Sequence, residues 1–139
     1  MPPEMSRYCI PYTPFRGRLE DSRVCLVSNA GVYIHGEQGS FNLQGDLTLR
    51  KVPSETEGTR LRVAHDHYDH TDADRDINLV FPIDRLRELA AEGRIKSVTA
   101  DFLGKGYSQA LREIKERVAW EIAKEVDRMR PDLVLLTGG

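Results

Sequence analysis

Two short apolar runs, far apart in the chain, constrain the fold most strongly. Residues 24–27 (Val-Cys-Leu-Val) and 133–136 (Leu-Val-Leu-Leu) are uninterrupted by polar side chains. Such runs are typical of strands buried on both faces, as in a parallel sheet. Parallel neighbours need crossover connections, and helical patterns lie between the two runs. We therefore expect an α/β fold with a parallel sheet of the Rossmann or flavodoxin-like type.

Weaker patterns complete this prediction. Residues 46–52, 61–64 and 77–81 are expected to be further short strands, and Ala30-Gly31-Val32 is expected to begin a loop that leads into a helix. Asp84 is the predicted N-cap of a helix that ends near Gly93. A longer helix is predicted over 108–129, because an apolar stripe recurs every three or four residues. Its members are Leu111, Ile114, Val118, Ile122 and Val126, and Trp120 lies off the stripe.

Size and composition exclude several classes of protein. The chain has 139 residues, enough for a single domain of residues 1–139, with residues 1–22 as a proline-containing arm. A net charge of -2 gives no attraction to nucleic acid. No run approaches the roughly 20 apolar residues of a membrane span, and no signal peptide is visible. We expect a cytoplasmic protein, in which Cys9 and Cys25 stay reduced.

The densest polar cluster is His65-Asp-His-Tyr-Asp-His70, which holds three of the four histidines. Its spacing matches the H-x-H-x-D-H signature of metallo-β-lactamase-like hydrolases, but no histidine follows His70 to complete that site. A simpler divalent-metal site, such as zinc bound by His65, His67, Asp69 and His70, stays open. The alternatives are a contact to a polar substrate or subunit, and a polar loop whose side chains bond only to each other.

Other candidate residues lie near the predicted strands. Ser28 and Asn29 follow the first apolar strand, at the edge where ligands bind in parallel sheets. Arg16 could clamp a carboxylate or phosphate. An equally good interpretation pairs the arginines of this region with Glu20 and Asp21 at the surface.

Several segments together resemble one known family. They are residues 12–24 (YTPFRGRLEDSRV), 26–32 (LVSNAGV), 62–69 (RVAHDHYD), 73–78 (ADRDIN) and 80–89 (VFPIDRLREL). In this order they are similar to the selenoprotein B family of glycine, sarcosine and betaine reductases, which includes the related D-proline reductase subunit. The resemblance extends from about Tyr12 to the last residue.

The resemblance implies an oxidoreductase component that cleaves a carbon–nitrogen bond in glycine, sarcosine, betaine or a D-proline-like substrate, with a dithiol as electron source. It also implies other reductase subunits as partners, among them a pyruvoyl-bearing subunit. The substrate contacts expected from it are Arg16, Ser28, Asn29, His65, His67 and Tyr68. In the family a selenocysteine or cysteine follows the strand that matches 133–136, and its selenolate attacks the carbon next to nitrogen.

No such residue is present, and we expect it immediately after Gly139, where an unread selenocysteine codon would truncate the product. On this interpretation the sheet is incomplete, the chain contains no catalytic residue and is inactive alone, and its unpaired last strand favours a homo-oligomer. The alternative is a self-contained metal- or ligand-binding module that uses loop 65–70.

Overall fold

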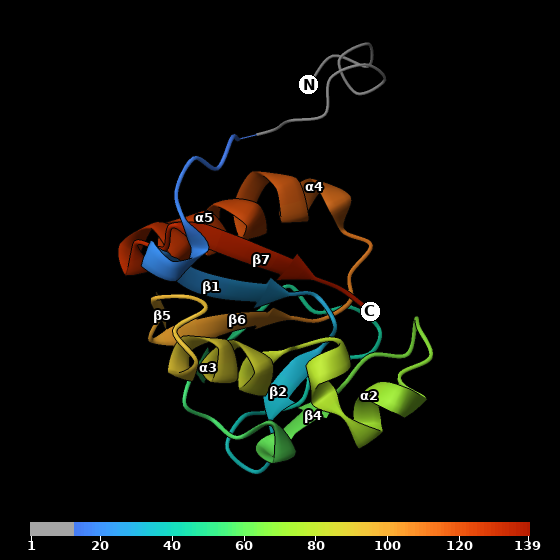
Figure 1. The fold of residues 1–139 in the computed structure, drawn as a ribbon. Coiled ribbons are helices and arrows are strands. Elements are labelled where there is room, and N and C mark those ends of the chain that lie inside the picture. The colour runs from blue at the N-terminus through green and yellow to red at the C-terminus, as the bar shows by residue number, and fades with distance from the viewer. Residues whose placement is uncertain (1–12) are drawn as a thin grey trace.

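The computed structural model describes residues 13–139, and its centre is a five-stranded sheet (Figure 1). Strand β1 (Arg23–Ser28) is flanked on one side by β5 (Ser97–Val98) and β6 (Asp101–Lys105). Strand β7 (Leu133–Thr137) lies on its other side. All four strands are parallel, and β3 (Leu49–Pro53) adds an antiparallel edge beside β6.

The two apolar runs are direct neighbours in this sheet. Strands β1 and β7 are in register from Val24 opposite Leu133 to Ser28 opposite Thr137. The mostly parallel sheet with helices confirms the predicted α/β fold, and β3 is its one antiparallel member. The predicted strand at 46–52 is present but begins three residues later, at Leu49.

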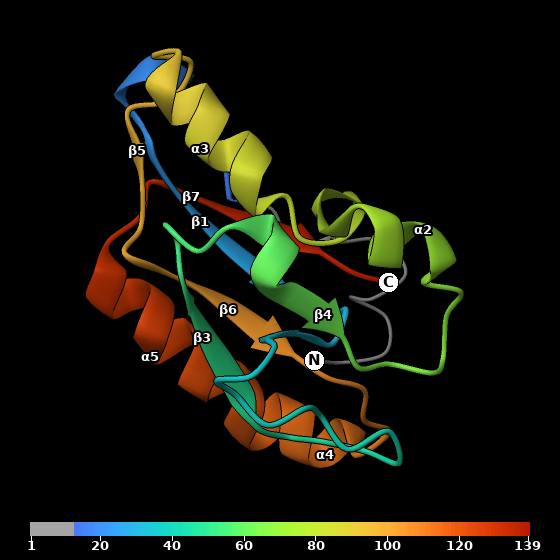
Figure 2. The ribbon, with the colours of Figure 1, turned by 90° about the horizontal axis from the view of Figure 1, so that it is seen from below.

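Helices cover both faces of the sheet (Figure 2). Helix α3 (Ile83–Ala91) lies on one face. On the other face, α4 (Leu111–Glu113), the π-helical η4 (Ile114–Val118) and α5 (Ala119–Met129) form one continuous helical segment. The short elements are η1 (Leu19–Asp21), η2 (Gly58–Arg60), α2 (Thr71–Arg75) and η3 (Ile77–Leu79). None of the helices in residues 13–139 is long and apolar enough to cross a membrane.

The apolar core follows this layering. Leu26, Phe81 and Phe102 are fully buried together between the sheet and the α3 side. On the opposite face Cys25 and Leu103 pack with other buried strand residues against Ile122, Val126 and Met129 of α5. Alternate residues of β1 therefore enter opposite layers, as expected for a strand buried on both faces.

The loop predicted to follow Ala30-Gly31-Val32 is instead a second, two-stranded sheet. Strand β2 (Val32–Ile34) pairs antiparallel with β4 (Leu61–Val63), which confirms the strand predicted at 61–64. Gly31, with a φ of 77°, turns the chain from the end of β1 into β2, so a strand rather than a loop leading to a helix begins at Val32.

The strand predicted at 77–81 was also wrong, because this segment is the 3-10 helix η3. Asp76 caps it by accepting a hydrogen bond from the backbone N–H of Asn78 at 3.0 Å. Ile77 and Phe81 are buried four residues apart, whereas Leu79 is exposed. That spacing is helical rather than alternating.

The two long helices were predicted with small errors at their ends. Asp84 does not cap α3, because the helix begins at Ile83 and Pro82 occupies the N-cap position. Gly93, with a φ of 70°, follows its end as expected. The second helix begins at Leu111 rather than 108 and ends at Arg130 in the left-handed conformation, before Pro131.

Strands β5 and β6 were not predicted at all. Segment 97–105 mixes small, charged and glycine residues with only two adjacent large apolar residues, Phe102 and Leu103. Strand β6 nevertheless lies inside the sheet, between β1 and β3, with Phe102 and Leu103 fully buried. Its pairing with both neighbours stabilises a strand that local sequence barely indicates.

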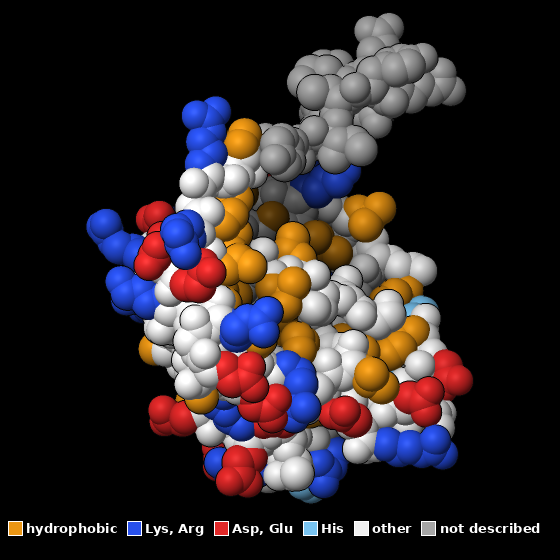
Figure 3. Space-filling model, in the orientation of Figure 1, with side chains coloured by type: hydrophobic (Ala, Val, Ile, Leu, Met, Phe, Trp, Pro, Cys, Tyr) orange, Lys and Arg blue, Asp and Glu red, His pale blue; other side chains and the backbone are white. Residues whose placement is uncertain are grey.

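The outer side of β7 is unpaired among the residues that the structure describes. Val134, Leu135 and Leu136 on this strand are exposed, and Leu136 keeps 73% of its surface. Figure 3 shows hydrophobic side chains gathered over this region, with charged side chains mostly around the margins. Trp120, which lies off the apolar stripe, is 65% exposed on α5.

Candidate functional site

Three parallel strands end at one edge of the sheet. Ser28 ends β1, Lys105 ends β6 and Thr137 ends β7. Backbone hydrogen bonds tie these ends together, from Asn29 N–H to the Thr137 carbonyl at 3.2 Å and from Gly31 N–H to the Lys105 carbonyl at 2.9 Å. This carboxyl edge is where parallel sheets bind ligands.

Two small cavities lie at this edge and share Asn29 and Lys105. One of about 270 Å³ is lined by Asn29, His65, Lys105, Gly106, Tyr107, Ser108, Leu111 and Ile114. The other, about 200 Å³, is lined by Val27, Ser28, Asn29, Lys105, Ile122, Leu136 and Thr137. We call them the edge cavities. Both are smaller than typical pockets for drug-sized ligands, about 300–1,000 Å³.

Lys105 is a buried cation between the edge cavities. The residue is only 8% exposed, and its Nζ donates a hydrogen bond to the Gly106 carbonyl at 2.8 Å. Burial lowers the pKa of Lys105, which the charge of Asp46 partly offsets. Within residues 13–139 no carboxylate lies within 4.0 Å of this ammonium, so its charge has no ion-pair partner there.

The His-rich loop 65–70 packs against the same edge. It leaves β4 at Val63, and the Ala64 N–H bonds to the Gly31 carbonyl at 2.8 Å. The His67 ring stacks on Tyr107 with centroids 3.4 Å apart. The His65 ring lies 4.7 Å from the ring of Tyr68 and 5.7 Å from that of Tyr107. Four aromatic or imidazole rings therefore form one cluster beside the carboxyl edge of the sheet.

His65 lines the larger edge cavity and has one ring nitrogen engaged by the backbone. Its Nδ1 accepts a hydrogen bond from the backbone N–H of His67 at 3.1 Å, which places the proton of the neutral ring on Nε2. Burial lowers the pKa of His65, and the nearby His67 lowers it further. The ring is therefore neutral at pH 7, with Nε2–H as its free donor.

Tyr68 links the loop to the ends of β1 and β7. Its hydroxyl donates a hydrogen bond to the Ala30 carbonyl at 2.9 Å, and burial raises the pKa of Tyr68 to about 12. A Cβ atom built on Gly139 would overlap the Tyr68 ring. The chain after β7 therefore passes directly beside this phenol.

The structure brings four of the six predicted substrate contacts together: Asn29, His65, His67 and Tyr68. Ser28 lies there too, but its hydroxyl is already engaged. It donates to the Val80 carbonyl at 3.1 Å and accepts from the Ala30 N–H at 3.2 Å. Ser28 is 1% exposed, so it contributes to the wall of the smaller edge cavity while its hydroxyl is engaged by the backbone.

Arg16 does not join this group. Its side chain is exposed, and the segment 13–22 lies at the start of β1, the end opposite to the site (Figure 1). The remaining residues of the predicted arm, 1–12, lie outside the described residues. The equally weighted alternative of surface pairing fits the neighbouring Arg18, whose Nε lies 3.7 Å from Glu20.

The four predicted metal ligands do not converge. Asp69 accepts hydrogen bonds from the backbone N–H and hydroxyl of Thr71, at 3.0 and 2.7 Å. His70 Nδ1 lies 2.8 Å from an Asp74 oxygen, and His67 Nδ1 lies 2.5 Å from Asp66. Over residues 13–139, no three His, Cys, Asp or Glu side chains are arranged to hold a metal ion. Asp69 and His70 instead bond to Thr71 and Asp74 of α2 and stabilise the start of that helix.

Cys25 is not placed to act as a nucleophile. It is fully buried in β1, and desolvation raises the pKa of its thiol. A reactive cysteine needs a lowered pKa and access to solvent. Cys9 lies outside the described residues.

Lys105 and Tyr107 are the site residues that sequence reasoning missed. Lys105 ends β6 and Tyr107 follows it, and β6 is a strand that was not predicted. The available signal was the apolar pair Phe102-Leu103 followed by Gly-Lys-Gly.

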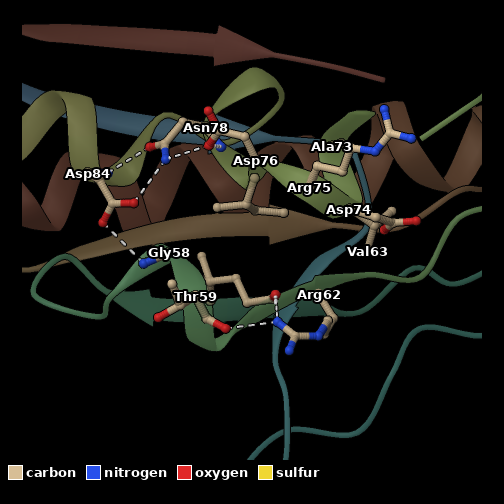
Figure 4. Close-up of a pocket in the computed structure, with 12 residues that line it drawn as sticks. Gly58, Thr59, Arg62, Val63, Ala73, Asp74, Arg75, Asp76, Asn78 and Asp84 are labelled. Carbon is tan, nitrogen blue, oxygen red and sulfur yellow. Dashed lines mark hydrogen bonds between the residues drawn. The ribbon is translucent and has the colours of Figure 1, made fainter. Parts of the chain in front are cut away.

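A separate pocket of about 110 Å³ lies beside α3, away from the strand ends (Figure 4). Its polar groups bond to each other: Asp84 accepts hydrogen bonds from the Gly58 N–H at 3.1 Å and from the Asn78 side chain at 2.9 Å. Asn78 Oδ1 in turn accepts from the Asp84 N–H at 3.0 Å. This network joins η2, η3 and α3, which gives the pocket a structural role.

Comparison with known proteins identifies relatives of the whole described region. The family model of glycine/sarcosine/betaine reductase selenoprotein B matches residues 19–139. D-proline reductase subunit gamma of Acetoanaerobium sticklandii is 38% identical over 131 residues, which cover 92% of this chain and 53% of that protein. No solved structure matches the chain, so the Rossmann or flavodoxin-like subtype stays a prediction.

A second relative is glycine reductase complex component B subunit gamma of Symbiobacterium thermophilum. It is 30% identical over 136 residues, which cover 92% of this chain and 31% of that protein. The chain therefore spans about half the length of the first relative and about a third of the second.

Proposed function

This chain belongs to the glycine/sarcosine/betaine reductase selenoprotein B family, and we propose that it is a component of a multi-subunit reductase for reductive carbon–nitrogen cleavage. The substrate class is a small amino acid or betaine: glycine, sarcosine, betaine or D-proline. The relatives named as D-proline and glycine reductase subunits support this class. The observation that carries the proposal is the meeting of three strand ends around Lys105, Asn29 and His65 beside small cavities.

The roles of the side chains follow from their chemistry. The Nε2–H of His65 and the Nδ2–H2 of Asn29 are neutral donors to a substrate carboxylate, and the Oδ1 of Asn29 can accept from a substrate ammonium. The rings of His67, Tyr68 and Tyr107 shield this side from water. The expected selenol or thiol supplies the nucleophile that attacks the carbon next to nitrogen, and a dithiol supplies the electrons.

The position of the end of β7 supports a nucleophile that follows this strand. Leu136 and Thr137 line the smaller edge cavity. A Cβ built on Gly138 would lie 2.8 Å from Asn29 Oδ1, and one on Gly139 would meet Tyr68. The chain after Thr137 is therefore held between two of the predicted substrate contacts, and its glycines allow this close approach.

Partners follow from the same proposal. We expect this chain to assemble with other reductase subunits in the cytoplasm, including a pyruvoyl-bearing subunit that helps bind amine substrates. The names of both relatives describe them as subunits, one of them of a reductase complex.

Activity of the native complex tests the function. The complex that co-purifies with this chain is given D-proline, glycine, sarcosine or betaine together with a dithiol, and the reduced product is measured. We expect turnover of at least one of the four. In a complex reconstituted with His65→Asn, turnover falls, whereas His35→Asn, on an exposed residue outside the site, leaves it unchanged. Turnover of none of the four would contradict the proposal.

The nucleotide sequence after codon 139 tests the source of the reactive residue. An in-frame TGA codon followed by an open reading frame supports a selenocysteine there, and mass spectrometry of the native protein should then show a longer product. A different stop codon, or no coding sequence beyond it, would contradict the unread selenocysteine.

A further inference from the structure

We propose that the ammonium of Lys105 binds the carboxylate of the substrate at the edge cavities. This inference rests on the proposed function and adds the residue that recognises the acid group. Glycine, sarcosine, betaine and D-proline differ around nitrogen but all carry a carboxylate next to the reacting carbon. A single fixed cation can therefore serve the whole substrate class.

The first argument is the unpaired charge. Lys105 is 92% buried, yet its Nζ has one protein hydrogen bond, to the Gly106 carbonyl at 2.8 Å. An ammonium has three donors, so two of them have no acceptor among residues 13–139. Leaving a buried charge unpaired is costly, and an anionic ligand would relieve that cost.

The second argument is the position of the cation. Lys105 lines both edge cavities, together with Asn29, so a ligand in either one meets the ammonium. The larger cavity also receives His65, whose ring is neutral and offers an N–H donor. A cation and neutral donors together suit a carboxylate, because carboxylate oxygens accept up to four hydrogen bonds.

The third argument is the contrast with Lys51, which is more exposed than Lys105 and already has an ion-pair partner. Lys51, on the neighbouring strand β3, lies 2.7 Å from Glu125 and is 44% exposed. Lys105 ends the adjacent strand, is almost fully buried, and has Asp46 as the acidic group that influences its pKa without forming an ion pair. Lys51 therefore provides the matched control.

Calorimetric titration of the native complex with two ligand pairs tests the proposal. D-proline is compared with D-prolinamide, and glycine with glycinamide, which keep the shape and remove the negative charge. We expect an acid to bind and its amide to bind at least about 30-fold more weakly. Lys105→Met should weaken acid binding by a similar factor and leave amide binding unchanged, and Lys51→Met should change neither.

A measurement on the unmodified protein covers the case in which Lys105→Met fails to fold. Hydrogen exchange followed by mass spectrometry should show slower exchange in peptides covering 101–108 when D-proline or glycine is added, and no change with the amide. Two results would contradict the role of Lys105 but not the proposed function. One is that an acid binds without slowing exchange in 101–108, and the other is that Lys105→Met binds the acid as tightly as the unchanged protein. No binding of either acid overturns the proposed function as well.

Discussion

At the scale of single residues, Gly31 decides where the site loop begins. It has a φ of 77°, its N–H bonds to the Lys105 carbonyl, and its carbonyl accepts the Ala64 N–H. A Cβ at this position would collide with the Ala64 carbonyl oxygen. One residue thus joins the ends of β1 and β6 to the start of loop 65–70, and only glycine satisfies both the dihedral angle and the space.

Gly31→Ala should therefore lower the free energy of unfolding by more than the left-handed backbone alone explains. We expect a loss of about 2–4 kcal/mol, measured by urea denaturation. Gly36 is the matched control, because its φ is 81° but no atom lies within 4 Å of an added Cβ. Gly36→Ala should cost about 1 kcal/mol. Equal losses in the two variants would contradict the steric argument.

His65 gives the site a pH dependence. Burial and the neighbouring His67 lower the pKa of its ring, so the unfolded chain binds a proton more readily than the folded one. The free energy of unfolding should therefore fall as the pH drops below about 6.5. His65→Asn removes this contribution, and its amide oxygen can still accept the His67 N–H.

Urea denaturation at pH 7.5 and 5.5 measures the effect, and NMR titration reports the ring directly. The stability difference between the two pH values should be smaller in His65→Asn than in the unchanged protein. His35→Asn, on an exposed residue, serves as the control for loss of a histidine. A His65 ring that titrates above 6.5 would show that the assignment is wrong.

At the scale of elements, Asp84 joins three short helices that would otherwise meet only through side-chain packing. Its carboxylate accepts the Gly58 N–H of η2 and the side chain of Asn78 of η3, and pairs with Arg87 one turn later in α3. Arg87 continues the network to the carbonyls of Ser54 and Thr56. These bonds hold η2 and η3 against α3, the helix that covers one face of the sheet.

Asp84→Ala should lower the free energy of unfolding by about 2–3 kcal/mol, because hydrogen bonds to a charged acceptor are lost and the Gly58 N–H is left without its partner. Asp72→Ala is the control, since Asp72 and its partner Arg75 are both more than three quarters exposed. That change should stay within about 0.5 kcal/mol. Thermal and urea unfolding of the two variants provide the comparison.

At the scale of the whole molecule, the two outer strands of the sheet differ in their side chains. Strand β3 carries Arg50 and Lys51 at one edge, whereas β7 presents the exposed Val134, Leu135 and Leu136 at the other. An unpaired strand with exposed apolar side chains is a template for association. Gly138 and Gly139, which follow β7, lie beside Asn29 and Tyr68 of the site. A second chain that pairs with β7 would therefore also lie close to the site.

The chain studied alone should therefore self-associate through β7. Sedimentation at increasing protein concentration should show a rising average mass, and Leu136→Lys should keep the chain monomeric. Leu43→Lys provides the control, because Leu43 is 42% exposed in the loop that precedes β3, a strand that does not pair with β7. A monomer at every concentration, or equal effects of the two changes, would exclude this association.

The amino-acid pattern alone determined the elements that carry strong local signals. The apolar runs of β1 and β7 predicted buried strands of one parallel sheet, and the stripe from Leu111 to Val126 predicted the long helix, because burial on two faces or on one face leaves a distinct pattern. The motifs around Asn29, His65, His67 and Tyr68 named residues that the fold brings to one edge of the sheet, and their role as substrate contacts stays a prediction. The family resemblance agrees with the comparisons.

Only the tertiary structure decided the rest. Strand β6 forms because β1 and β3 pair with it on both sides, and no local pattern records those partners. Lys105 is therefore invisible as a site residue until β6 places it beside Asn29 and His65. Arg16 lies away from the site because it precedes β1, and Asp69 and His70 are not turned toward a shared metal because their hydrogen-bond partners are Thr71 and Asp74.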